Sequence, residues 1–208
     1  MVKVSAPAMS LEASGKLGGA LVFSKWKGRA YIRSLVTPAN PKSGPQKGVR
    51  AMMKFLSQAW AALAAGTKAD WQDRADQTTI STFNAFIGYN MNRWRRFLTP
   101  TQLDPATEAS TALTVSAITA TAAIRQITLS LTPSGATNIW GFAIFRSPTG
   151  TFDGVFSNCI AAVPANAGNA ISYVDTPLEA GTYYYSARIF NIDGKVGAES
   201  TEATATVS

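Results

Sequence analysis

The chain has 208 residues, 46% of them hydrophobic and 15% charged, with a formal net charge of +7. This length is comfortable for two domains that each bury a core, and the composition is that of a globular protein. With no histidine and a single cysteine, Cys159, the chain excludes an internal disulfide, a cysteine-based metal site and histidine-based catalysis. We therefore expect a protein that is not an enzyme and needs no cofactor.

The sequence also lacks membrane and export signals. No apolar run approaches the roughly 18 residues of a membrane-spanning helix, and the N-terminus has no continuous apolar stretch of the secretory kind. We expect a soluble protein that does not leave the cell by the secretory route.

Charge divides the chain unevenly. Residues 1–100 hold 15 Lys and Arg against four acids, whereas residues 101–208 hold four against eight. The two halves therefore carry +11 and −4. This asymmetry predicts a basic module made for an acidic partner, joined to a nearly neutral one.

Residues 19–36 predict a β-hairpin. Two strand-like segments, ALVFSKW and RAYIRSLV, flank Lys27 and Gly28, and a two-residue loop ending in glycine suits the turns that match strand twist. The expected cross-strand pairs are Trp26 with Arg29, Ser24 with Tyr31, and Phe23 with Ile32.

The two faces of this hairpin differ in chemistry. Alternation puts Leu21, Phe23 and Ile32 on one face, and a cationic and aromatic set on the other. Tryptophan and arginine dominate buried interfaces, so we interpret the hairpin as a partner-binding surface. The alternative is a solvated basic edge that discourages strand pairing. Both an acidic protein and a nucleic acid fit as partners. The candidate residues are Trp26, Arg29, Tyr31, Arg33, Lys25 and Lys27.

Helices are predicted after the hairpin. The three prolines of residues 37–46 indicate an extended connector, and a capping box at Ser43 with Pro45 in the first turn predicts that a helix begins there. A second cap at Thr67 predicts a short helix to about Ala75. A third at Ser81 opens a helix ending in the sequence RWRR, which favours cations at its C-terminal end.

Three smaller features can be explained by protein structure without a bound ligand or a catalytic role. The acids Asp70, Asp73 and Asp76 recur every three residues, but acids are favoured near helix N-termini without any bound cation. Cys159 lies in an apolar run and is interpreted as a small buried side chain. The arginines of RWRR suit either a solvated helix end or an anionic contact.

The C-terminal half predicts an all-β domain. Residues 99–111 lack periodicity and are interpreted as a linker. Seven short alternating segments then follow between turn signals, which indicates a β-sandwich. The predicted organisation is an α+β hairpin-plus-helix module over residues 1–98, the linker over 99–111, and the sandwich over 112–208.

This C-terminal part resembles the fibronectin type III and related immunoglobulin-like modules. The resemblance rests on Trp140 in WGFAIFRSPTG, on YVDTPLEAGTYYYSARI, and on the Asn-x-Asp-Gly turn that follows. It implies an immunoglobulin-like sandwich and says little about function, because such modules serve many roles.

The N-terminal part is similar to a group of uncharacterised bacteriophage and prophage proteins. The shared pattern reads GKLGGALVFSKWKGRAYIRSLVTPANPKSGPQKGVR here, and the similarity extends over about residues 15–98. It implies a role in the virion or in its assembly.

From these features we expect a non-enzymatic virion structural protein of a bacteriophage, assembled in the host cytoplasm. The favoured role is capsid decoration or stabilisation, in which the N-terminal half docks on a capsid protein and the immunoglobulin-like domain is displayed. Self-association on the particle is expected, because many weak contacts on a lattice reinforce one another. The alternatives are a tail, neck or fibre-attachment protein, and a nucleic-acid-binding module.

Overall fold

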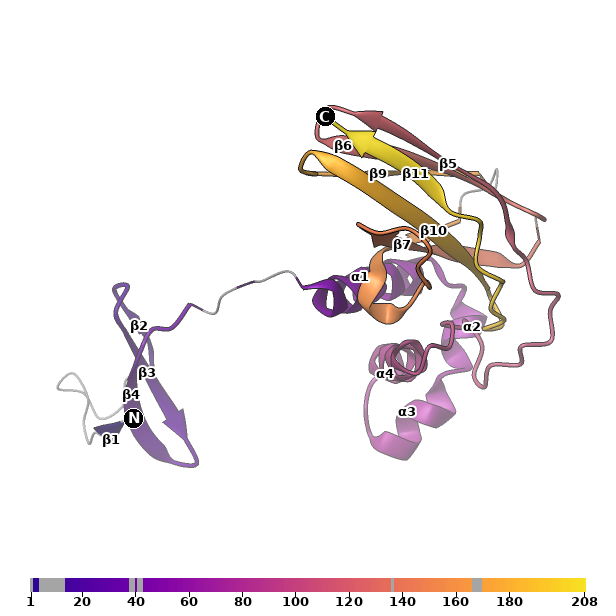
Figure 1. Cartoon of the computed structure of the whole chain (residues 1–208). Helices are drawn as coiled ribbons and strands as arrows, with labels where there is room; N and C mark the ends of the chain where they lie inside the picture. The colour runs from indigo at the N-terminus through magenta and orange to yellow at the C-terminus, as the bar shows by residue number, and fades with distance from the viewer. Residues whose placement is uncertain (1, 4–13, 38–39, 41–42, 136, 166–169) are drawn as a thin grey trace. The chain divides into compact units, whose positions relative to one another are not determined.

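The computed structural model describes residues 2–3, 14–37, 40, 43–135, 137–165 and 170–208. The chain is a mixture of α-helices and antiparallel β-sheets, an α+β protein, and it divides into two compact units, Met1–Pro41 and Lys42–Ser208 (Figure 1).

The first unit is a small antiparallel sheet. Its strands lie in the order β1-β4-β3-β2, so the hairpin of β3 and β4 is at the centre. The strands are β1 (Val2–Lys3), β2 (Gly15–Leu17), β3 (Leu21–Trp26) and β4 (Arg29–Ser34).

The second unit begins with helices and continues with strands. The helices are α1 (Gly44–Ala62), α2 (Ala65–Ala69), α3 (Gln72–Thr78) and α4 (Thr82–Arg95). The strands, with one short 3-10 helix η2 (Phe156–Asn158), are β5 (Val115–Ala123), β6 (Gln126–Pro133), β7 (Ile139–Ser147), β8 (Cys159–Pro164), β9 (Ile171–Asp175), β10 (Gly181–Asn191) and β11 (Ala203–Val207). These seven strands confirm the seven segments predicted from the sequence.

The seven strands form two sheets that share one hydrophobic core. One sheet has the order β11-β10-β7-β8 and the other β5-β6-β9, and neighbouring strands are antiparallel. We call them the paired sheets. Their shared core contains buried side chains from both, among them Leu129, Phe142 and Ile189.

The helices cover the other face of the four-stranded sheet. Along β7 the side chains alternate: Phe142 and Ile144 belong to the core between the sheets, whereas Ala143 and Phe145 belong to a second core built with the helices. At its centre the Phe55 ring lies 5.0 Å from that of Trp140 and 5.0 Å from that of Phe190, centroid to centroid. The helices and the four-stranded sheet therefore fold around a common aromatic core.

Two glycines allow α1 to approach the strands closely. A Cβ added at Gly48 would lie 2.8 Å from the carbonyl oxygen of Phe156, and one at Gly44 would clash with the carbonyl of Ser157. Both glycines lie on the side of α1 that faces η2 and β8. A larger residue at either position would push the helix away from the sheet.

The boundary expected at residues 99–111 falls inside the second unit instead. Thr99 and Thr101 are buried, and the Asn90 side chain makes two bonds with the Thr101 backbone: it accepts from the N–H at 2.7 Å and donates to the carbonyl at 3.0 Å. Ser110 donates from its N–H and its hydroxyl to the carboxylate of Asp193, at 2.7 and 2.8 Å. This polar segment therefore connects the helices to the β10–β11 connection, and the division of the chain lies near residue 41.

The predicted helix starts are partly correct. Ser43 is the N-cap of α1 and Pro45 lies in its first turn, but the Ser43 side chain makes no capping hydrogen bond. Ser81 caps α4 as expected, its hydroxyl accepting from the N–H of Asn84 at 3.2 Å. The cap predicted at Thr67 is wrong, because α2 begins at Ala65 with Ala64 as its N-cap.

Candidate docking surface

The hairpin of the first unit has the predicted register. Trp26 pairs with Arg29, Ser24 with Tyr31, and Phe23 with Ile32. Lys27 and Gly28 have φ of 48° and 77°. Two successive residues with positive φ form the type I′ turn, whose twist matches that of the strands.

The pairing brings cations and aromatic rings to one face of the sheet. Strand alternation puts Trp26, Arg29, Tyr31 and Arg33 on the same side, and Lys16 joins them because it pairs with Val22, which in turn pairs with Arg33. We call these five residues the cationic face.

Two of the predicted partner-binding residues lie elsewhere. Lys25 pairs with Ala30, so it lies on the opposite face with Phe23 and Ile32. Lys27 is in the turn, with its Nζ 4.8 Å from the centroid of the Trp26 ring. The six predicted residues therefore do not form one surface, because the two-residue period of a strand separates Lys25 from Trp26.

The cationic face is open to solvent. Trp26 is 66% exposed, and none of the described side chains of the first unit is fully buried. Lys16, Arg29 and Arg33 make no ion pair with a carboxylate of the described residues. The arrangement offers an exposed indole and three cations that could meet anionic groups of another molecule.

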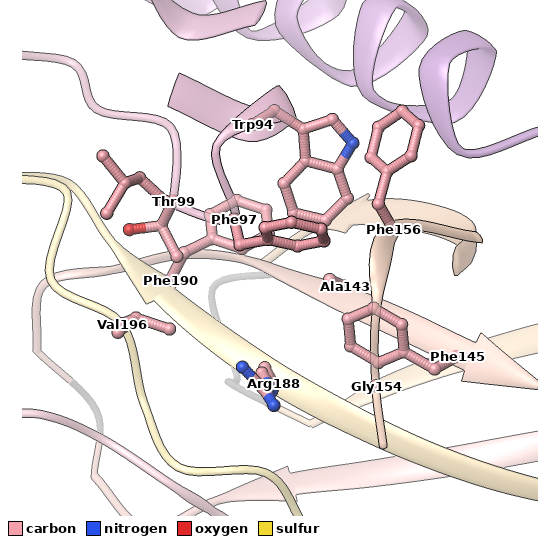
Figure 2. A pocket seen from close by; sticks show the side chains of 11 residues that line it. Trp94, Phe97, Thr99, Ala143, Phe145, Gly154, Phe156, Arg188, Phe190 and Val196 are labelled. Carbon is pink, nitrogen blue, oxygen red and sulfur yellow. The ribbon is translucent and has the colours of Figure 1, made fainter. Parts of the chain in front are cut away.

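The second unit holds a small aromatic pocket between the end of α4 and the four-stranded sheet (Figure 2). The rings of Trp94, Phe97, Phe145 and Phe156 surround it, and Arg188 lies on the sheet side. Its volume is about 40 Å³. A water molecule needs about 10–15 Å³ on this measure, so the pocket has room for a few waters.

The polar groups beside the pocket are largely paired with one another. The Glu199 carboxylate accepts from Arg188 Nη2 at 2.8 Å, from the Ser186 hydroxyl and from the N–H of Gly154 at 3.0 Å. Burial alone would raise the pKa of Glu199, but these hydrogen bonds outweigh it and hold that pKa below its ordinary value. Trp94 Nε1 and Arg188 Nε are buried and have no hydrogen-bond partner within the described part of the chain.

The single cysteine and the acids of the second and third helices show no sign of a reactive or metal-binding site. Cys159 is fully buried, and burial raises the pKa of its thiol to about 12, so it stays protonated and unreactive at neutral pH. Asp70, Asp73 and Asp76 are exposed and belong to the end of α2 and to α3. Within the described ranges, no three Cys, Asp or Glu side chains are grouped so as to hold a metal ion.

Within these same ranges no helix is both long and apolar enough to cross a membrane.

The sequence interpretation missed the aromatic core between helices and sheet. The signal for it was present in β7, where the run WGFAIF is apolar at consecutive positions. A strand with one solvated face alternates apolar and polar residues, whereas a continuous apolar run indicates burial on both faces.

Comparisons with known proteins give weak similarities only. No protein-family model and no curated protein matches the chain. Among solved structures, a β-1,2-glucanase from Parabacteroides distasonis matches 47% of this chain over 14% of its own length, with 21% identity and a TM-score of 0.35. An Fn3-like protein from Clostridium thermocellum matches 44% of this chain over 88% of its own length, with 18% identity and a TM-score of 0.35. A family 76 glycoside hydrolase from a bovine Bacteroides thetaiotaomicron strain matches 46% of this chain over 20% of its own, with 11% identity and a TM-score of 0.34.

Proposed function

We propose that the paired sheets are an immunoglobulin-like module of the fibronectin type III kind. Two packed antiparallel sheets of three and four strands, in the orders β5-β6-β9 and β11-β10-β7-β8, agree with that class. The Tyr183 hydroxyl donates to the Glu179 carbonyl at 3.1 Å. This resembles the corner in which a tyrosine early in the sixth strand bonds the backbone a few residues upstream.

We further propose that the protein is a non-enzymatic structural component of a bacteriophage virion, most simply a capsid decoration or stabilising protein. The virion assignment rests on the resemblance of residues 15–98 to phage proteins. The single structural observation that supports a docking role is the exposed cationic face on a sheet without a fully buried described side chain.

A sheet this small, with both faces accessible, gains little from burying apolar surface and is marginally stable alone. Covering one face with a partner would supply the missing burial. The first unit has six Lys and Arg against one acid, whereas the second has 13 against 11. An acidic capsid surface would therefore attract the first unit selectively.

The test is loading of the variant Trp26→Ala/Arg29→Ala onto particles in infected cells, with Arg125→Ala as a control. Arg125 is also an exposed cation, but it lies in the β5–β6 turn of the second unit. We expect the double variant to fold and to lose particle association, since an anchoring Trp or Arg commonly contributes about 2 kcal/mol or more. Normal loading of the double variant would contradict the docking role and leave the hairpin a solvated edge.

Copy number and DNA binding distinguish the alternative functions. Quantitative composition of purified particles should give hundreds of copies for a decoration protein, against about a dozen or fewer for a neck or tail component, because a capsid offers many equivalent sites. Absence from the particle, together with salt-dependent DNA binding that requires Arg29 and Arg33, would favour the nucleic-acid alternative.

A further inference from the structure

The second unit has another open surface, which shares no lining residue with the aromatic pocket. It is a groove of about 470 Å³ between the flank of α1 and the edges of the paired sheets. Its main lining residues are Lys47, Arg50 and Lys54 of α1, Ile160 and Val163 of β8, and Tyr173 of β9.

One wall of the groove is cationic. Lys47, Arg50 and Lys54 are spaced three and four residues apart, which puts them in one row along the helix. Arg50 and Lys54 are exposed and Lys47 is half-buried. The described residues lining the groove include no acid, so Lys47 and Lys54 give this wall a positive charge that attracts an anionic ligand.

The opposite wall is apolar. Ile160, Val163 and Tyr173 are half-buried and pack against the core between the sheets. Each therefore presents part of its apolar surface to the groove. A ligand that fits both walls has acidic side chains on one side and apolar side chains on the other.

The floor of the groove is the edge of the four-stranded sheet. β8 is the last strand of its sheet. The N–H of Ala165 donates to the Trp140 carbonyl at 3.0 Å, and bonded and non-bonded pairs alternate along an antiparallel ladder. Ala162, three residues earlier and opposite Ala143, therefore directs its N–H and carbonyl away from β7. These groups can pair with another strand.

We propose that this groove binds an acidic, extended segment of a partner protein by strand addition to β8. The backbone of that segment would pair at Ala162, its acidic side chains would meet the α1 cations, and its apolar side chains would cover Ile160 and Val163. Alternation of the two side-chain types is what a strand provides. Nucleic acid satisfies the cations but has no strand backbone to pair with the edge. The groove and the cationic face of the hairpin share no residue, so each can be tested by its own variants.

The probe is an acetylated, amidated nonapeptide of alternating glutamate and valine. Titrated into the isotopically labelled full chain, it should bind saturably and shift the amide NMR signals of Ala162 and its β8 neighbours. The variant Lys47→Glu/Lys54→Glu should weaken binding roughly tenfold or more, because each exposed ion pair changes affinity by up to several-fold and reversal adds repulsion.

Two controls make the experiment specific. Arg96→Glu/Arg125→Glu changes the net charge equally at exposed positions outside the groove, and it should leave the affinity nearly unchanged. Two further peptides are N-methylated at every second residue. In one peptide the methyl groups lie on one edge of the strand, and in the other they lie on the opposite edge. Only the peptide methylated on the edge that meets β8 should lose binding. Circular dichroism checks the fold of each variant, and Lys47→Ala/Lys54→Ala serves as a milder second variant.

Several results would overturn the proposal. Equal weakening by the two charge-reversal variants would mean general electrostatic attraction. Equal binding of both methylated peptides would rule out strand addition, and a lack of saturable binding would rule out the site. A single-stranded DNA oligomer that competes with the peptide and depends on Lys47 and Lys54 in the same way would make the groove a nucleic-acid site.

Discussion

The two units of this chain achieve stability differently. The second unit buries two cores, one between its paired sheets and one between helices and sheet. The first unit has a well-formed turn and a definite register but no fully buried side chain among its described residues. Local sequence thus specifies the shape of the hairpin, whereas burial, the dominant favourable term in folding, is concentrated in the second unit.

The largest expected effect tests whether the helices share a core with the four-stranded sheet of the second unit. Phe55→Ala should lower the free energy of unfolding by about 3–5 kcal/mol, because a buried ring between Trp140 and Phe190 is replaced by a cavity. Denaturant unfolding followed by both circular dichroism and tryptophan fluorescence measures it. Met53→Ala, at a 39% exposed position of the same helix, should cost well under 1 kcal/mol. If the two probes reported separate unfolding transitions, the helices and the four-stranded sheet would not unfold as one unit, which would contradict a shared core.

A smaller effect is expected at the contact of α1 with β8. Gly48→Ala should destabilise the second unit by about 1–3 kcal/mol, because the added methyl group meets the Phe156 carbonyl. Gly88→Ala is the matched control in α4, where the added Cβ has no neighbour within 4 Å. It should stabilise the protein by about 0.5–1 kcal/mol. Thermal denaturation measures the midpoint temperature of both variants. A shift of the same sign in the two variants would contradict close packing at Gly48.

The stability of the second unit should also decrease at acidic pH. The pKa of Glu199 is lower in the folded protein, so its contribution to stability is present above the unfolded pKa and is lost as the pH falls through the folded value. In Glu199→Gln the stability should therefore fall less steeply between about pH 5 and pH 3. Denaturant unfolding across this range measures the slope. An unchanged slope in Glu199→Gln would contradict the assignment.

The smallest expected effect is that of removing the first unit. A chain beginning at Lys42 should unfold with a midpoint temperature close to that of the full chain, because both cores lie within residues 42–208. Limited proteolysis of the full chain should first cut near residue 41 and spare residues 99–111. Early cleavage inside residues 99–111, or a clearly lower midpoint for the shortened chain, would restore the boundary suggested by composition.

Local patterns predicted the elements well and their packing poorly. The hairpin register followed from Lys27 and Gly28, and the seven strands followed from alternation between turn signals. Residues 99–111 were misinterpreted because Thr, Asp and Ser look like a linker when their partners are unknown. Thr101 bonds with Asn90 and Ser110 with Asp193, and no local pattern indicates such distant pairs.

The candidate docking residues show the same difference between local pattern and packing. Trp26, Arg29, Tyr31 and Arg33 were grouped correctly on one face because strand alternation is local information. Charge alone suggests Lys25 as a partner-binding residue, but its pairing with Ala30 puts it on the other face. The groove beside β8 depends on α1 packing against that strand, which the sequence analysis did not anticipate.

Because helices cover only one of the two sheets, the outer surfaces of the two sheets should differ in how much they vary over evolution. With α1 and α4 packed over the four-stranded sheet (Figure 1), the outward surface of β5, β6 and β9 is left to face solvent. Thr119, Ser130 and Ser172 pair side by side there and are exposed. Substitutions at such positions usually change stability by less than about 0.5 kcal/mol. Natural variants should therefore diverge first on this hydroxyl-rich surface, while the helix-covered surface with Trp140 and Phe145 changes little.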